Sequence, residues 1–107
     1  MLLNTVLRVM QLYLAYDVEE SQPIEEVFDE EEIKCLQIIQ ETQIKETPKT
    51  INRFNPQRLS WAFWIIARLG GWKGNSKQRK AGPIIIKRGL EKFDMIYAGW
   101  KMAKNVT

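Results

Sequence analysis

Residues 82–104 are GPIIIKRGLEKFDMIYAGWKMAK, and this stretch decides the fold of the 107-residue chain. Gly82-Pro83 is typical of a helix start, because proline suits the first helical position. From there apolar side chains recur at intervals of three and four residues, which places them on one face of a helix. This core stripe comprises Ile86, Leu90, Phe93, Tyr97 and Trp100. The stretch therefore predicts a final helix that ends near Lys104.

A second stripe of small and apolar residues lies beside the core stripe on the same predicted helix. It comprises Ile85, Gly89, Ile96, Gly99 and Ala103. Glycine inside a helix costs about 1 kcal/mol relative to alanine, so two glycines in one stripe suggest that another backbone approaches closely there. Two interpretations remain open from spacing alone: tight packing within this chain, or contact with a second protein.

The preceding helix is predicted to begin at Asn55-Pro56, with Asn as the N-cap and Pro at the first helical position. It is expected to run to Leu69 and to end at Gly70-Gly71, because glycine takes the left-handed conformation that closes a helix. Its apolar residues form two opposite stripes, one with Phe63 and Ile66 and one with Trp61 and Trp64. This helix should therefore be packed on both sides.

Two more helices are predicted upstream. One begins at Asp29, where Asp29 and Glu32 have the spacing of a capping box, and fades near Thr42. The other covers residues 2–16, which are apolar around most of the circumference and would need burial on all sides. A domain of this size seldom surrounds a terminal helix, so we expect its neighbour to be missing or to be supplied by a partner. With no strand pattern, the chain is predicted to be all-α, a small orthogonal bundle of about four helices.

Charge is divided unequally between the two halves of the chain. Residues 1–50 carry 11 acidic and four basic residues, a net charge of −7, whereas residues 51–107 carry 12 basic and two acidic residues, a net charge of +10. Such asymmetry suits an anionic partner for the basic half, but it also suits attraction between the halves within one fold. Both interpretations stay open.

The basic half contains one candidate polar site, the segment from Lys73 to Arg88. Its cations are Lys73, Lys77, Arg79, Lys80, Lys87 and Arg88. Together they could meet DNA phosphates, with Trp72 stacking on a base. The alternative is that the cations are simply solvated and Trp72 packs within the protein.

Residue types needed for catalysis are scarce. The chain has no histidine, and its clustered acids are consecutive at one helix start, which favours a solvated cap over a metal site. Cys35 has no histidine to activate it and is predicted to be a buried helical residue in a reducing compartment. We therefore predict no enzyme activity, no metal and no cofactor. No apolar run is long enough to span a membrane, and residues 1–16 lack the basic start of a signal peptide.

Sequence blocks along the chain resemble one known family. Residues 66–72 are IARLGGW, residues 88–104 are RGLEKFDMIYAGWKMAK, and the segment Leu12 to Leu36 combines a Leu-x-Tyr-Leu-Ala helix end, an acidic loop with Pro23 and a Glu-rich helix start. This pattern resembles the C-terminal dimerisation domain of the Tn-five transposase family, in the insertion-sequence-four group. It departs from the family at Lys87, where members usually carry Trp, and in its basic loop, which favours contact with DNA.

The resemblance implies a fold, a partner and a boundary. Full-length members cut and paste DNA with an Asp-Asp-Glu triad that holds Mg²⁺ on a ribonuclease-H-like core, and that core would lie upstream of Met1. Residues 1–16 would be the helix that leaves the core, and residues 17–107 the dimerisation domain. The family's last helix packs against its two-fold copy, which assigns Ile96, Gly99 and Ala103 to a dimer contact, with Ile85 and Gly89 continuing the stripe.

Two functions follow as hypotheses. In the first, the chain is a dimerising transposase fragment in the bacterial cytoplasm, which pairs with itself or with intact transposase and inhibits it. In the second, it is a small DNA-binding module that uses residues 73–88. Neither hypothesis involves a small-molecule substrate or a membrane.

Overall fold

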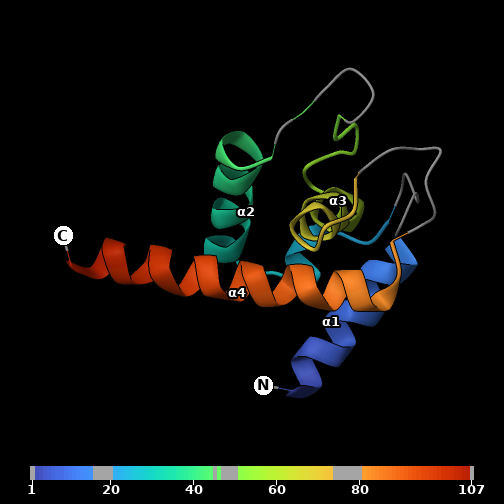
Figure 1. Cartoon of the computed structure of the whole chain (residues 1–107), viewed down its shortest axis with the longest axis horizontal. Coiled ribbons are helices and arrows are strands. Elements are labelled where there is room, and N and C mark those ends of the chain that lie inside the picture. Colours follow the sequence, from blue (N-terminus) through green and yellow to red (C-terminus); the bar gives the residue numbers. More distant parts are fainter. Residues whose placement is uncertain (1, 16–20, 45, 47–50, 74–80, 107) are drawn as a thin grey trace.

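The computed structural model describes residues 2–15, 21–44, 46, 51–73 and 81–106. This part of the chain is an all-α bundle, as predicted, with four α-helices and no named strand. The α-helices are α1 (Leu2–Ala15), α2 (Glu30–Thr42), α3 (Leu59–Leu69) and α4 (Pro83–Val106), and a short 3-10 helix, η1 (Ile24–Glu26), precedes α2. Figure 1 shows α3 nearly end-on and α4 lengthwise, so these two helices cross at a steep angle.

Helix α3 is the centre of the bundle. Every residue from Leu59 to Ala67 is buried, because α1, α2 and α4 all pack against it. The two tryptophans of its second stripe, Trp61 and Trp64, are 6% and 3% exposed. The prediction that this helix is covered on two sides is therefore confirmed.

The crossing of α3 and α4 is set by two glycines, Gly89 on α4 and Gly70 at the C-cap of α3. A methyl group on Gly89 would collide with the carbonyl oxygen of Ile66, and one on Gly70 would collide with the carbonyl oxygen of Ile85. The two backbones therefore touch without side chains between them. Gly71 follows with φ of 103°, the left-handed conformation that ends α3 as predicted.

The predicted start of α3 at Asn55-Pro56 is wrong by about one turn. Residues 55–58 form a turn instead, in which the backbone N–H of Arg58 donates to the carbonyl of Asn55 at 2.9 Å, and α3 begins at Leu59. The cap comes from a distant segment: the Ser60 N–H donates to the Ser21 hydroxyl at 3.0 Å, and the Leu59 N–H donates to the carbonyl of Gln22 at 2.9 Å. A local cap motif could not reveal this long-range partner.

The predicted capping box at the start of α2 is confirmed. The Glu32 N–H donates to the Asp29 carboxylate at 2.8 Å, and the Asp29 N–H donates to the Glu32 carboxylate at 3.0 Å. Glu32 also accepts two hydrogen bonds from the guanidinium of Arg8, at 2.8 and 2.9 Å. Because Arg8 lies on α1, this buried carboxylate fastens α1 to the start of α2.

Helix α1 is buried on one face and uncovered on the other. Leu12 and Ala15 are 0% and 5% exposed against the bundle. On the opposite face, Val6, Leu7, Met10 and Leu14 are between 55% and 71% exposed. The sequence-based expectation that this helix lacks a neighbour therefore holds for one face, while the other face is part of the core.

Candidate pairing surface

The second stripe of α4 is divided between two environments. Gly89 is buried and Ile85 half-buried, because both face the end of α3 within the same chain. The assignment of Gly89 to a dimer contact is therefore wrong, because the Ile66 carbonyl already occupies the space that a second backbone would need. The assignment of Ile85 stays a prediction. Ile96 is half-buried against the core, whereas Gly99 and Ala103 are exposed.

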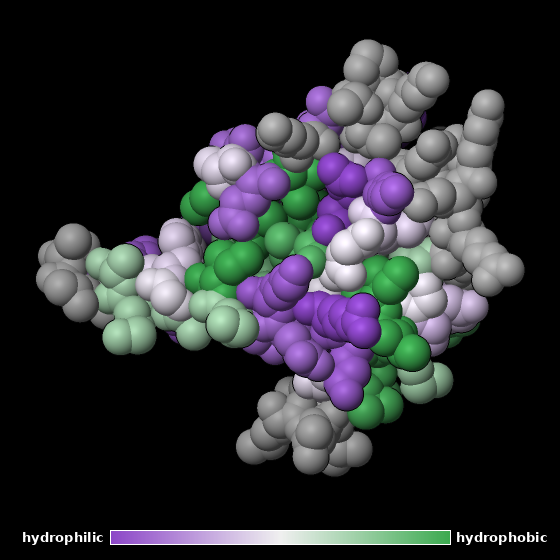
Figure 2. Space-filling view, viewed as in Figure 1, coloured by the Kyte–Doolittle hydropathy of each residue, from purple (hydrophilic) through white to green (hydrophobic). Residues whose placement is uncertain are grey.

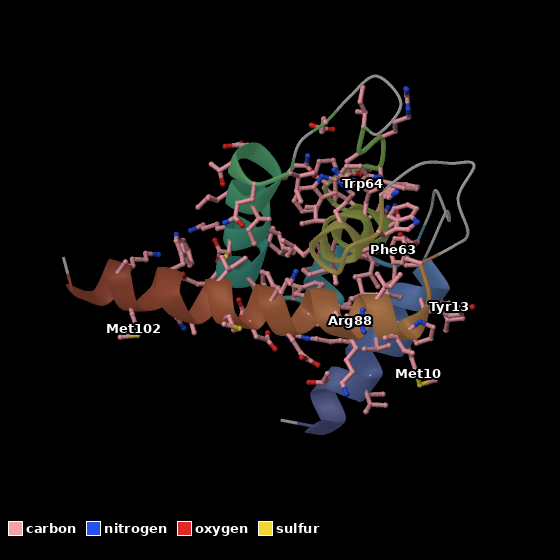
Figure 3. The ribbon with its side chains drawn as sticks, viewed as in Figure 1. Met10, Tyr13, Phe63, Trp64, Arg88 and Met102 are labelled. Carbon is pink, nitrogen blue, oxygen red and sulfur yellow. The ribbon has the colours of Figure 1, made fainter. Side chains whose placement is uncertain are left out.

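The C-terminal half of α4 extends beyond the rest of the bundle, with the C-terminus at its far end (Figure 1). Two large apolar side chains are exposed there, Met95 at 76% and Met102 at 70%. Met95, Gly99 and Met102 are spaced by four and three residues, so they share one face of the helix. Figure 3 shows Met102 pointing away from α2. We call Met95, Gly99 and Met102 the outer stripe.

Sequence reasoning missed the two methionines of this stripe. The spacing was visible in the sequence, but a methionine fills a core as readily as it covers a surface. The stripe predicted from the sequence, which contains Ile96 and Ala103, lies next to the outer stripe on the helix surface. Gly99 belongs to both, and a methyl group added to Gly99 would meet no atom within 4 Å. The fold itself therefore does not require glycine at this position.

The opposite side of the projecting half is closed by a row of aromatic rings. The Phe93 ring lies edge-on to Phe28, with centroids 5.8 Å apart, and stacks on Tyr97 at 5.8 Å. Tyr97 stacks on Trp100 at 6.1 Å. The ammonium of Lys104 covers the Trp100 ring at 4.9 Å and forms an ion pair with Glu31 of α2 at 3.2 Å. The side of α4 toward α2 is thus occupied, and the outer stripe faces away from it.

The predicted DNA-contacting cations are only partly placed. Lys73, Lys87 and Arg88 are exposed, and Figure 3 shows Arg88 on α4. The other three, Lys77, Arg79 and Lys80, lie outside the described residues. Glu91 and Asp94 are also exposed on α4, so the charge along this helix is mixed. Figure 2 shows hydrophilic side chains over the middle of α4 with hydrophobic areas on both sides.

Trp72 packs within the protein and is not available to a base. Its side chain is 8% exposed, and its ring lies 5.9 Å from that of Phe63. Its backbone N–H donates to the carbonyl of Ala67 at 2.9 Å, which ties the residue to the end of α3. The interpretation of Trp72 as a core residue is therefore correct.

A hollow of about 500 Å³ lies beside Trp72, between the ends of α2 and α3 and the middle of α4. Its walls are mainly apolar and include Ile44, Leu69 and Ile96. Its charged residues are Arg68, Lys73 and Lys92, with no acidic residue among those that line it. The Arg68 guanidinium donates to the carbonyl of Lys73 at 2.7 Å and lies over the Trp64 ring at 5.5 Å.

The candidate reactive groups lie apart from this surface. Cys35 is 1% exposed, and burial together with the charge of Glu32 raises the pKa of its thiol, so the thiolate is disfavoured. Among the described residues, no group of three or more acidic or cysteine side chains is placed to hold a metal ion.

Comparisons of the chain with protein-family models, with curated proteins and with solved structures find no match. Across the described residues, the helices are too short or too polar to cross a membrane.

Proposed function

We propose that this chain is a protein–protein pairing module whose α4 packs against α4 of a second copy. The observation that carries the proposal is the outer stripe, Met95, Gly99 and Met102, on a helix that extends beyond its own bundle. Exposed large apolar side chains that share one face are typical of an interaction surface. A two-fold contact, in which the same stripe is used by both copies, is the commonest geometry of such pairs.

Gly99 supports this assignment because its smallness has no use inside the chain. A helix-interior glycine costs about 1 kcal/mol relative to alanine. At Gly89 the cost is offset by contact with α3, but around Gly99 the space is open. A second helix that approaches closely at Gly99 would supply the missing reason, and the flanking methionines would pack around the crossing point.

The sequence resemblance supports a role for this pairing in DNA transposition. The proposed role is that of a C-terminal dimerisation domain similar to those of Tn-five-type transposases, or of a fragment that pairs with an intact transposase and inhibits it. In either case the chain binds protein and carries out no chemical step itself.

Oligomeric mass is the direct test. We expect the wild-type chain to run as a dimer in size-exclusion chromatography with light scattering, and Gly99→Leu to run as a monomer of unchanged helicity. Gly82→Leu is the matched control, since a methyl group added to Gly82 also meets no atom within 4 Å and Gly82 lies outside the outer stripe. A monomeric wild type, or a dimer that survives Gly99→Leu, would overturn the proposal.

A DNA-binding module remains the second candidate, because Lys73, Lys87 and Arg88 are all exposed. Contact with phosphates would show as duplex binding that weakens steeply with salt, and the slope of log K against log salt would fall by about 1 for each cation removed. Lys87→Ala and Arg88→Ala should then each lower the slope, while Lys34→Ala on α2 should leave it unchanged. No binding at low salt would eliminate this candidate.

A further inference from the structure

The hollow beside Trp72 has a composition that the pairing function does not explain. Its residues come from three parts of the chain. Ile44 follows α2, Leu69 and Trp72 lie at and just after the end of α3, and Ile96 lies in the middle of α4. Hollows of this volume that combine an apolar lining with a few convergent polar groups are the usual shape of binding sites. The outer stripe borders it at Met95, but most of its wall comes from the segments that follow α2 and end α3.

Cations at the hollow are not balanced by acids. Lys73 and Lys92 are both exposed, and neither forms an ion pair within the described part of the chain. The hollow has no acidic side chain in its lining. The third cation, Arg68, is directed to the backbone carbonyls of Trp72 and Lys73, at 3.4 and 2.7 Å. These bonds hold Arg68 to the segment that follows α3, so the two exposed lysines are the cations best placed to meet an anion.

We propose that this hollow binds an acidic segment of a partner protein. An apolar side chain of the segment would lie on Leu69 and Ile96, and flanking carboxylates would reach Lys73 and Lys92. Met95 suits such a wall, because an unbranched thioether adapts to different apolar partners. The open shape fits an extended or helical segment laid across it, as in other groove-binding interactions.

Nucleic acid is a poorer fit to the same hollow. Base stacking needs an open aromatic face, and the Trp72 ring is 8% exposed and packed beside Phe63. Phosphate recognition also gains from many cations along a backbone, whereas two lysines flank an apolar floor here. Carboxylates beside a bulky apolar side chain match this arrangement better.

Fluorescence anisotropy with labelled peptides tests the proposal. The probes are peptides of about 12 residues in which one Leu, Phe or Trp is flanked by glutamates, each paired with a peptide that carries glutamines instead. We expect at least one acidic probe to bind the wild-type chain, and its glutamine counterpart to bind about tenfold more weakly or not at all. Failure of every acidic probe to bind would overturn the proposal.

Two charge-reversal variants on α4 locate the binding. Lys92→Glu at the hollow should weaken binding of the acidic probe by about tenfold. Lys87→Glu, equally exposed on the same helix but outside the hollow, should leave it nearly unchanged. Circular dichroism should show the same helicity for both variants, since both side chains are exposed. Equal losses in the two variants would overturn the assignment to the hollow.

A single-stranded oligonucleotide of the same label serves as the competing ligand. We expect the acidic probe to remain bound in its presence. An oligonucleotide that displaces the probe, and whose own binding is lost in both Lys92→Glu and Lys87→Glu, would overturn the proposal in favour of a basic nucleic-acid surface.

Discussion

The two halves of α4 are built from similar residues and lie in opposite surroundings. In the first half, Gly89 lets the helix backbone touch that of α3, and Ile86 and Leu90 are buried. In the second half, Gly99 meets nothing, and the flanking methionines are exposed. The chain's own fold explains why residue 89 is glycine. Nothing in the described part of the chain explains why residue 99 is glycine, and a partner helix would.

Two ion pairs join α2 to other helices of the bundle, and they differ in burial. Arg8 of α1 and Glu32 of α2 have side chains 23% and 8% exposed. Lys104 and Glu31, which tie the second half to α2, have side chains 50% and 41% exposed. The Arg8–Glu32 pair is therefore expected to contribute more to stability than the Lys104–Glu31 pair of the projecting half of α4.

The largest expected effect is on stability at the first glycine. Gly89→Ala places a methyl group against the Ile66 carbonyl, and the packed backbone cannot yield without separating α3 from α4. We expect a loss of about 3 kcal/mol, at the upper end of what overpacking costs. Urea unfolding measures it. A loss below about 1 kcal/mol would show that the crossing is looser than the structure indicates.

The two ion pairs give the next effect. Glu32→Gln removes the charge that faces Arg8 and weakens the capping box, so we expect a loss of about 2 kcal/mol. Glu31→Gln, one residue earlier, breaks an exposed pair and should cost less than about 0.5 kcal/mol. The same urea titration compares them. Equal losses would contradict the difference in burial between the two pairs.

Local sequence patterns predict some of these features and fail for others. Helix existence, the capping box at Asp29, the Gly70-Gly71 stop and the Pro83 start all follow from local chemistry, and all are present. The start of α3 did not follow, because Ser21 caps it from a distance. Small-residue spacing on α4 identified a close approach correctly at Gly89 but could not say which helix approaches. That answer depends on tertiary packing, which a periodic pattern does not contain.

Gly99→Ala should raise the stability of the monomer. Alanine is the better helix former, and its methyl group would meet no atom within 4 Å. We expect a gain of about 0.5–1 kcal/mol in a chain kept dilute enough to be monomeric. The same substitution is therefore expected to have opposite effects on stability at Gly89 and at Gly99. A loss of stability in the dilute Gly99→Ala chain would reveal an unrecognised contact.

The uncovered face of α1 is a second exposed apolar surface, and there the question is whether its side chains are buried by another molecule. Figure 3 shows Met10 pointing away from the bundle, and Leu14 on the same face is 71% exposed. Met10→Gln with Leu14→Gln should change the free energy of unfolding by less than about 0.5 kcal/mol. The same double variant should strongly reduce fluorescence of a bound hydrophobic dye. Wild-type chain that binds no dye would show that this face is already covered.

The smallest effect is expected at Asp94, where the two halves of α4 meet. Desolvation raises the pKa of the Asp94 carboxyl even though the residue as a whole is exposed; Arg8 opposes the rise, and Glu32 adds to it. A raised pKa in the folded state means that the folded chain holds this proton more tightly than the unfolded chain. The group therefore costs no stability below its ordinary pKa of 3.8, and costs progressively more as pH rises through the folded value.

Asp94→Asn removes that dependence. The variant should match the wild type well below pH 3.8 and become slightly more stable as pH rises above that value, with the gain held small by solvent screening. Thermal unfolding across this pH range measures the difference, and Glu91→Gln controls for the loss of one negative charge on the same helix. An equal gain in stability for both variants would show that the effect comes from the change in net charge. A gain confined to Asp94→Asn would assign the cost to desolvation of this carboxyl. The carboxyl would then lose hydration where α4 still lies near Arg8 and Glu32, at the boundary between its packed and projecting halves.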